Sequence, residues 1–115
     1  MSISIGSIVW GVKDIQRAII FWSAALNYKI KGEVSEDWAM LIPNHGTGVQ
    51  LSLKLITSDK PRRHHLDLFA DNQHEEVERL VGLGATRKKD WRYEDGADYV
   101  VLCDPDGNSF CVVQK

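Results

Sequence analysis

The chain carries the same order of segments twice, and this internal duplication limits its fold more than any other feature. Each half has the pattern of a strand, a helix and three further strands. The halves superpose with a shift of about 58 residues, which brings Val12-Lys13-Asp14 onto Ala70-Asp71-Asn72. Leu26-Asn27 falls in the same way on Leu83-Gly84. We therefore predict an α+β protein built from two tandem βαβββ units.

In the first half, residues 3–12 have the β-branched enrichment of a buried strand, and Asp14 provides a helix N-cap. Asn27 suits the left-handed residue that ends this helix. Strands are predicted at residues 28–34, 38–42 and 49–56. The helix is predicted from apolar residues at helical spacing, namely Ile15, Ala18, Ile19, Trp22, Ala25 and Leu26.

In the second half, residues 63–70 are predicted as a strand, and Asn72 with Glu75 has the spacing of a capping box. The helix is predicted to end at Gly84. Strands follow at residues 85–91, 98–103 and 109–114, the last two joined by the turn Asp104-Pro105-Asp106-Gly107. We expect one domain, residues 1–115, with a first unit at 1–57 and a second at 62–115. The helices should cover the outer face of a curved, cup-like mixed sheet that surrounds a common cavity.

Composition excludes several classes of partner. With 115 residues and 43% hydrophobic content, the chain can bury one core. Its 14 Lys+Arg against 16 Asp+Glu give a net charge of −2, so we expect neither a nucleic-acid nor a membrane partner. The absence of a long apolar run and of a signal-peptide pattern favours a cytoplasmic protein. Cys103 and Cys111 fall out of register across the predicted hairpin, which indicates two reduced thiols.

Strand alternation selects the residues that face the predicted cavity. In the strand at 63–70, Leu66 and Leu68 should face the helix, whereas His65, Asp67 and Phe69 should face the open side. By the duplication, Ser7 takes the place of His65. Trp10 and Trp22 have the phase of core residues under the first helix.

Several motifs resemble the vicinal oxygen chelate superfamily of glyoxalases, extradiol dioxygenases and bleomycin-resistance proteins. They are Val12-Lys13-Asp14, Phe21-Trp22, His65-Leu66-Asp67-Leu68, Leu83-Gly84-Ala85 and Asp104-Pro105-Asp106-Gly107-Asn108-Ser109-Phe110. The resemblance covers nearly the whole chain and is closest to the small glyoxalase-like subgroup. It implies the cup-shaped fold, a small organic molecule as partner and a homodimer.

The resemblance also implies where a divalent metal would bind. Metal-dependent members place ligands on the first and last strands of each unit, which correspond here to Ser7, Gln50, His65 and Cys111. The Gln50 position rests on aligning Val49-Gln50-Leu51 with Phe110-Cys111-Val112. This set lacks the carboxylates that hard cations prefer, so we expect no cofactor. If a metal did bind, its ligands would be His65, Gln50 and Cys111, a set better suited to Zn²⁺.

His65 and Cys111 keep alternative roles. His65 could be a general acid/base oriented by Asp67, which is the catalytic hypothesis for a lyase or dioxygenase-like enzyme. We favour the interpretation that the two residues form an ordinary structural pair, because a His and an Asp often share one strand face by chance. Cys111 is interpreted as an inert buried thiol, because no neighbouring cation would lower its pKa.

Further residues are candidates for ligand binding. Trp38 and Ser52, with Ser7, Gln50 and Cys111, are predicted on the cavity side. Trp91 and Tyr93 precede the loop 94–97 and either close over a planar ligand as a flap or pack at a sheet edge. We expect sequestration of a small molecule, as in bleomycin-resistance proteins. Enzymatic activity at His65 and a purely structural role are the alternatives.

Overall fold

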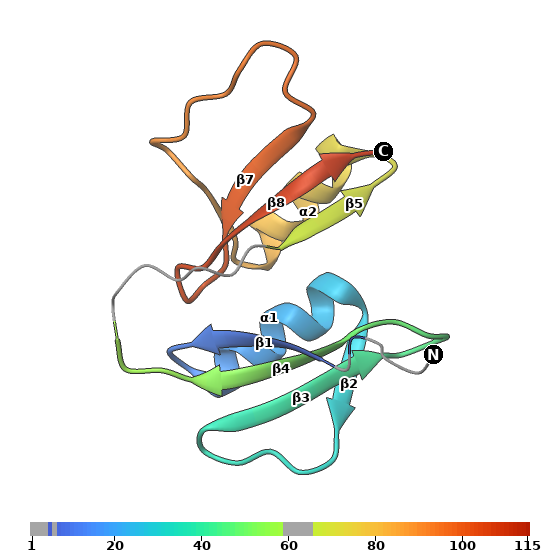
Figure 1. Ribbon diagram of the computed structural model, residues 1–115, viewed down its shortest axis with the longest axis vertical. Coiled ribbons are helices and arrows are strands. Elements are labelled where there is room, and N and C mark those ends of the chain that lie inside the picture. Colours follow the sequence, from blue (N-terminus) through green and yellow to red (C-terminus); the bar gives the residue numbers. More distant parts are fainter. Residues whose placement is uncertain (1–4, 6, 59–65) are drawn as a thin grey trace. The chain divides into compact units, whose positions relative to one another are not determined.

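The computed structural model describes residues 5, 7–58 and 66–115 (Figure 1). It contains two compact units, Met1–Lys60 and Pro61–Lys115, which are considered separately below. Each has the order strand, helix and three strands, so the α+β fold with two βαβββ units is confirmed. None of the described helices is long and apolar enough to cross a membrane.

The first unit contains a four-stranded mixed sheet with the order β1-β4-β3-β2. β1 and β4 are parallel neighbours, and the other two pairs are antiparallel. The parallel pair places the start of the first strand beside the last strand, with Ser7 opposite Gln50. The elements are β1 (Ser7–Val12), α1 (Ile15–Leu26), β2 (Tyr28–Lys31), β3 (Trp38–Pro43) and β4 (Gln50–Leu55).

Helix α1 begins and ends at the residues that the sequence predicted. Asp14 Oδ1 accepts a hydrogen bond of 3.0 Å from the Arg17 amide, and Asn27 has the left-handed φ of 56°. Trp10 and Trp22 are fully buried, with ring centroids 5.8 Å apart in an edge-on arrangement. Phe21, outside the predicted stripe, is also buried and packs edge-on against Trp22.

The second unit repeats this topology with the sheet order β5-β8-β7-β6. β5 and β8 are parallel, so Asp67 lies opposite Cys111. β7 and β8 form an antiparallel hairpin, in which Val101 also lies opposite Cys111. The elements are β5 (Asp67–Ala70), α2 (Gln73–Leu83), β6 (Thr86–Arg87), β7 (Tyr99–Cys103) and β8 (Ser109–Gln114).

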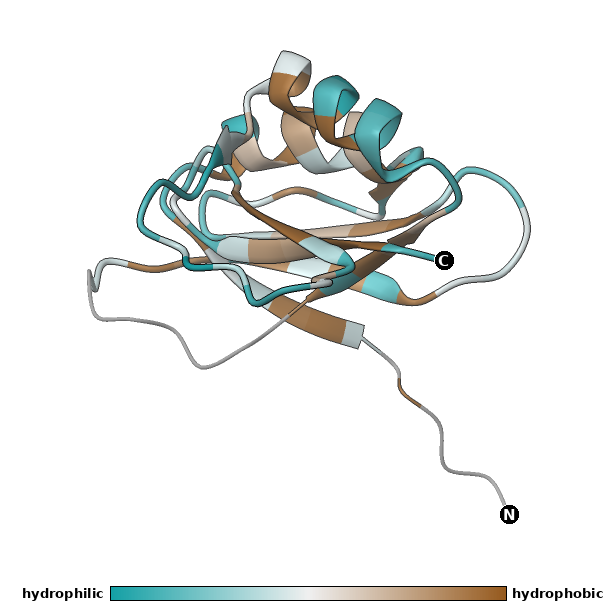
Figure 2. Cartoon of the chain, turned by 90° about the horizontal axis from the view of Figure 1, so that it is seen from above, coloured by the Kyte–Doolittle hydropathy of each residue, from teal (hydrophilic) through white to brown (hydrophobic). Residues whose placement is uncertain are grey.

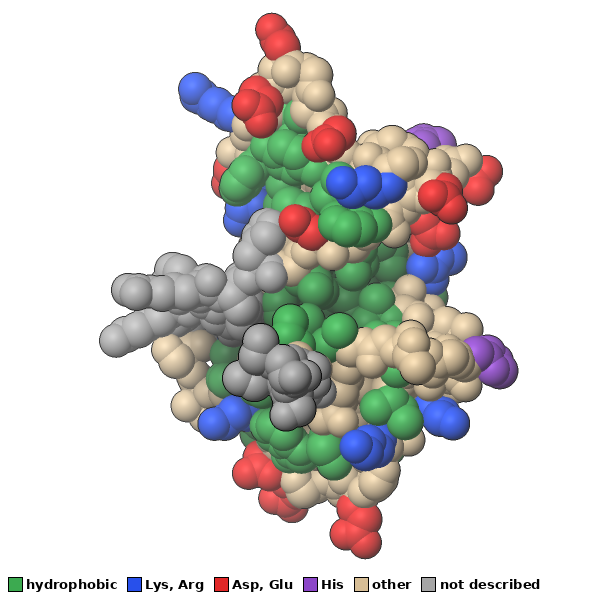
Figure 3. Space-filling model, turned by 45° about the vertical axis from the view of Figure 1, so that its right-hand side comes forward, with side chains coloured by type: hydrophobic (Ala, Val, Ile, Leu, Met, Phe, Trp, Pro, Cys, Tyr) green, Lys and Arg blue, Asp and Glu red, His purple; other side chains and the backbone are tan. Residues whose placement is uncertain are grey.

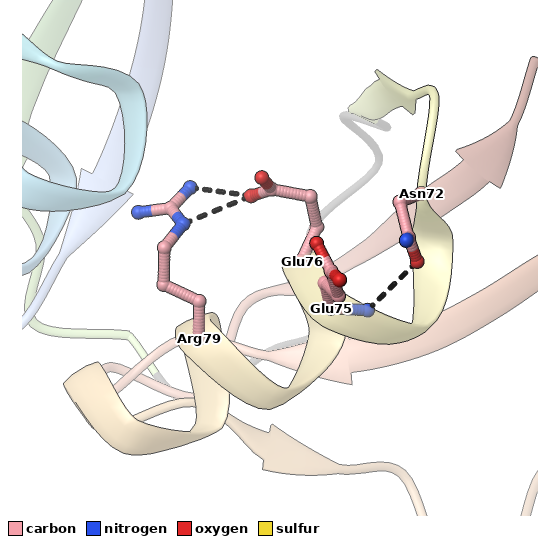
Figure 4. A network of polar contacts seen from close by, with 4 residues as sticks. All are labelled: Asn72, Glu75, Glu76 and Arg79. Carbon is pink, nitrogen blue, oxygen red and sulfur yellow. Dashed lines mark hydrogen bonds and ion pairs between the residues drawn. The ribbon is translucent and has the colours of Figure 1, made fainter.

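The first turn of α2 carries two polar contacts of different kinds (Figure 4). Asn72 accepts a hydrogen bond of 3.2 Å from the Glu75 amide, which confirms it as the N-cap. Arg79 pairs with Glu76 at 2.7 Å, one turn earlier, on the exposed side of the helix. Gly84 ends the helix with a φ of 123°, a backbone conformation that favours glycine.

Several predicted strands are longer than the observed ones. The strand predicted at 85–91 is only the two-residue β6, followed by one more backbone bond from Lys88 to Val101. β2 ends at Lys31 rather than at residue 34. β1 begins at Ser7, and residues 3, 4 and 6 of that predicted strand lie outside the described residues, as do residues 63–65 of the strand predicted at 63–70. Alternation shows which residues can join a strand, whereas the ladder ends where the partner strand turns away.

The hairpin turn at residues 104–107 is confirmed. The Gly107 amide donates to the Asp104 carbonyl at 2.9 Å, and the Asp104 carboxylate accepts from two further backbone amides. Cys103 lies opposite Ser109 and Cys111 opposite Val101, so the cysteines are out of register as predicted. Both are free thiols.

In each unit the helix covers one face of the sheet. Apolar residues run along the strands and under the helices, and polar residues occupy the outer turns (Figure 2). In β4, Leu51 and Leu53 belong to the buried side, and in β8, Phe110 and Val112 do so. The opposite face of each sheet bears the residues between these positions.

Candidate functional site

The open face of the first sheet is polar at one end and cationic along its edge. Its side chains follow from the strand register and include three lysines and no carboxylate among the described strand residues. Trp38 is half-buried on this face, opposite Lys54 and away from Gln50. The face comprises Ser7, Val9, Lys29, Lys31, Trp38, Met40, Ile42, Gln50, Ser52 and Lys54.

Four of these residues form a continuous series of hydrogen bonds. Lys31 Nζ donates to Gln50 Oε1 at 3.2 Å, and Gln50 Nε2 donates to Ser52 Oγ at 3.1 Å. Ser52 Oγ lies 2.6 Å from Ser7 Oγ, and either hydroxyl could be the donor. Ser52 is 1% exposed, so its hydroxyl is held within this series. We call Ser7, Lys31, Gln50 and Ser52 the Ser-Gln-Lys cluster.

The strand register changes one sequence alignment. Val12 and Ala70 end the first strands of the two units, where they lie opposite Leu55 and Gln114. Ser52 lies three residues before Leu55, and Cys111 lies three residues before Gln114. Ser52 is therefore the residue of the first unit that is equivalent to Cys111. Gln50, which the sequence alignment had paired with Cys111, lies two residues earlier on the same face.

The second unit has a pocket of about 430 Å³ on the open face of its sheet. This volume lies in the range of small-molecule sites. Three aromatic rings, two carboxylates and one ammonium contribute to it, and the upper part of Figure 3 shows hydrophobic side chains beside charged ones of both signs. The lining residues are Asp67, Phe69, Trp91, Asp98, Tyr99, Cys111, Val113 and Lys115.

Aromatic contacts shape one wall of this pocket. Trp91 and Tyr99 meet edge-on with centroids 6.5 Å apart, and Trp91 Nε1 donates to the Tyr99 hydroxyl at 3.3 Å. Phe69 is 69% exposed, and the ammonium of Lys115 lies 4.6 Å from its ring centroid. Phe69 and Trp91 are exposed, Tyr99 is half-buried, and all three rings line the pocket.

Tyr93 has a different role from Trp91. Its hydroxyl accepts a hydrogen bond of 2.8 Å from the buried Val101 amide, at the edge of β7 beyond the short β6. Its ring lies 5.5 Å from that of Tyr99. The Tyr93 hydroxyl thus contacts the edge of β7, whereas Trp91 lines the pocket.

Cys111 and Asp67 lie side by side on the pocket floor. They face each other across the parallel β5 and β8 pair. Burial, and after it the Asp67 carboxylate, raises the pKa of the Cys111 thiol. A raised pKa keeps the thiol protonated near neutral pH, which supports the interpretation of Cys111 as an inert residue.

The donor groups at the described positions Ser7, Ser52 and Cys111 do not fit the divalent metal of the wider superfamily. Ser7 and Ser52 are neutral hydroxyls hydrogen-bonded to each other, and Cys111, whose pKa is raised by burial and then by Asp67, would have to lose its proton to bind a metal. Among residues 5, 7–58 and 66–115, no group of three or more His, Cys, Asp or Glu side chains could hold a metal ion. His65 lies outside the described residues, so its predicted position is not tested.

Several site residues were not singled out in the sequence. Phe69 was placed on the open face by alternation, but nothing marked it as part of a pocket. Asp98, Tyr99 and Lys115 come together only through the pairing of β7 with β8. Lys31 is on an edge strand, where a lysine is ordinarily solvated, and only its contact with Gln50 distinguishes it.

Solved structures with this fold share little sequence with the chain. The fosfomycin resistance protein FosX from Listeria monocytogenes is similar with a TM-score of 0.77 and 16% identity, covering 100% of this chain and 93% of that one. A glyoxalase/bleomycin resistance protein/dioxygenase family enzyme from Burkholderia phytofirmans PsJN has a TM-score of 0.73 and 16% identity, covering 97% of this chain and 98% of that one. A possible glyoxalase from Bacillus cereus has a TM-score of 0.71 and 19% identity, covering 97% of this chain and 99% of that one.

Family membership rests on the sequence match rather than on these likenesses. Among curated proteins, none matches the chain. A family model described as a glyoxalase-like domain matches residues 7–113, which include both βαβββ units from β1 to β8. The chain therefore belongs to the glyoxalase-like domain family, within the vicinal oxygen chelate superfamily that its motifs resemble.

Proposed function

We propose that this protein binds a small planar organic molecule in the pocket of its second unit and sequesters it without a divalent metal. The observation that carries the proposal is the group of three aromatic rings, Phe69, Trp91 and Tyr99, that line a pocket of about 430 Å³. Aromatic rings bind flat ligands through stacked or edge-on contacts. The carboxylates of Asp67 and Asp98 and the ammonium of Lys115 supply polar contacts that fix the ligand's orientation.

The proposal includes two assignments that follow from the family resemblance. We propose that residues 1–115 act as one domain and that two chains form a homodimer. Light scattering on the purified protein tests the second assignment, because a monomeric mass across the micromolar range would reject it. The mode of action is binding, as for bleomycin-resistance proteins.

The alternative is an enzyme of the lyase or dioxygenase-like type that uses His65 as a metal ligand or as a general acid/base. One observation favours this alternative. Asp67 lines the pocket, and His65 is two residues before it in the sequence. Elemental analysis of protein purified without chelators separates the two. Binding alone predicts no stoichiometric metal in wild type or in His65→Ala, whereas about one equivalent in wild type that is lost in His65→Ala would support a metalloenzyme.

A ligand screen tests the binding function itself. Planar one-ring and two-ring aromatic compounds would be added in the presence of a chelator, and the shift in unfolding temperature measured. For a compound that stabilises wild type, Trp91→Ala should remove most of the shift, since Trp91 lines the pocket. Trp38→Ala is the matched control, because Trp38 lies on the other unit's sheet. Equal losses in both variants would contradict the assignment of the pocket.

A further inference from the structure

The Ser-Gln-Lys cluster lies on the open face of the first sheet. Its members come from three strands, Ser7 from β1, Lys31 from β2, and Gln50 and Ser52 from β4. Register explains their meeting, because Ser7 lies opposite Gln50 and Lys31 shares this face through Met40 and Ser52. None of the four residues lines the pocket of the second unit.

The hydrogen bonds of the cluster run in one direction from the ammonium. Lys31 donates to the carbonyl oxygen of Gln50, so the amide nitrogen of Gln50 is turned toward Ser52, to which it donates. Because Ser52 Oγ accepts this bond, its own proton can be given to Ser7 Oγ, 2.6 Å away. Each donor in such a series polarises the next. The second amide hydrogen of Gln50 remains as a donor, and the Ser7 hydroxyl, whose other acceptor is the Ile8 carbonyl at the long distance of 3.4 Å, can turn to a better acceptor.

The charged side chains around the cluster are positive, like the ammonium of Lys31. Lys29 and Lys54 lie on the same face as Lys31, and the described strand residues of this face include no carboxylate. Ser7 and Gln50 are half-buried and Lys31 is exposed, so the cluster is both partly desolvated and accessible. An ammonium next to neutral donors is the usual protein environment of a carboxylate or phosphonate oxygen.

The cluster also includes the positions that the resemblance to the superfamily implies for metal ligands in the first unit. Ser7 stands at the first-strand position and Ser52 at the last-strand position, as the strand register places it. Their hydroxyls bond to each other, and the positive charge at this place comes from Lys31 through Gln50. We propose that the cluster binds an oxyanion, the carboxylate, phosphonate or phosphate group of a small molecule, with the Lys31 ammonium and the Ser7 and Gln50 donors as its contacts.

The test is titration of the purified protein with methylphosphonate and, separately, with acetate, at constant ionic strength set with chloride. Affinity would be read from NMR shifts of the Gln50 side-chain amide, and the two anions distinguish a phosphonate-type from a carboxylate-type group. Lys31→Met should weaken binding of the preferred anion roughly tenfold or more, the effect of losing one charge-assisted hydrogen bond.

Lys29→Met is the matched control. It removes the same charge from the same strand and the same face, two residues from Lys31. We expect it to weaken binding by less than about threefold, because Lys31, and not Lys29, donates the hydrogen bond to Gln50 in the cluster. Ser7→Ala should also weaken binding, while Trp91→Ala in the other unit should leave it unchanged, which keeps this test separate from that of the pocket. Equal losses in the two lysine variants, or no saturable binding of either anion to wild type, would overturn the proposal.

Discussion

The hydroxyl of Tyr93 is expected to hold the edge of β7, and Tyr93→Phe tests this with the loss of one atom. The Val101 amide that donates to it is in a residue only 2% exposed, at a distance of 2.8 Å. A buried donor that loses its acceptor costs about 1–3 kcal/mol. For a chain of this size that corresponds to a decrease of roughly 4 °C in unfolding temperature per kcal/mol. The tyrosine ring, which packs on Tyr99, is retained by phenylalanine.

Tyr99→Phe is the control for this prediction. Its hydroxyl accepts from the indole of Trp91 at 3.3 Å, and because Trp91 is 43% exposed, water can replace the bond. We expect a loss of less than about 1 kcal/mol in this variant. Urea unfolding would give both free energies, and hydrogen exchange would show faster exchange of the Val101 amide in Tyr93→Phe alone. If Tyr93→Phe were within 0.5 kcal/mol of wild type, with Val101 exchange unchanged, the sheet-edge role of Tyr93 would be wrong.

Two further predictions concern the β7–β8 hairpin. Because the folded-state pKa of Cys111 is raised, the protonated thiol stabilises the fold fully below the unfolded pKa of about 8.5, and this contribution is lost as pH rises through the folded pKa. Urea unfolding should therefore show that the free energy of unfolding decreases less at alkaline pH in Cys111→Ala than in wild type, whereas Cys103→Ala should resemble wild type. A larger decrease in Cys111→Ala than in wild type would contradict the raised pKa. Asp104→Ala should lower the free energy of unfolding by about 2–4 kcal/mol, because it removes an acceptor from the buried amides of Asp106 and Asn108. A loss under 1 kcal/mol in a thermal melt would refute this.

The sequence predicted most reliably the features that depend on local chemistry. Asp14 and Asn72 cap helices because their side chains bond amides three residues ahead. The duplication predicted the order of elements in both units, and alternation assigned Trp10 to the core and Asp67 to the open face.

What the sequence missed depends on contacts between distant strands. Gln50 was aligned with Cys111 because β4 has no anchoring motif, and only pairing with β1 and β3 shows that Ser52 holds that position. Lys31 gains its role from Gln50, 19 residues away, so no local pattern could indicate it. The different contacts of Trp91 and Tyr93 likewise depend on β7, since Trp91 bonds the Tyr99 hydroxyl and Tyr93 bonds the Val101 amide.

The most direct test of the central claim is an NMR titration of the four tryptophan indole groups. Wild-type protein, in buffer that contains a chelator, would be titrated with a planar compound that stabilises the protein in the thermal screen. We predict that the Trp91 indole signal shifts with saturation, because Trp91 lines the pocket, while the buried Trp10 and Trp22 signals stay in place. A Trp91 signal that does not move, or one that moves only when a divalent metal is added, would contradict metal-independent binding in this pocket.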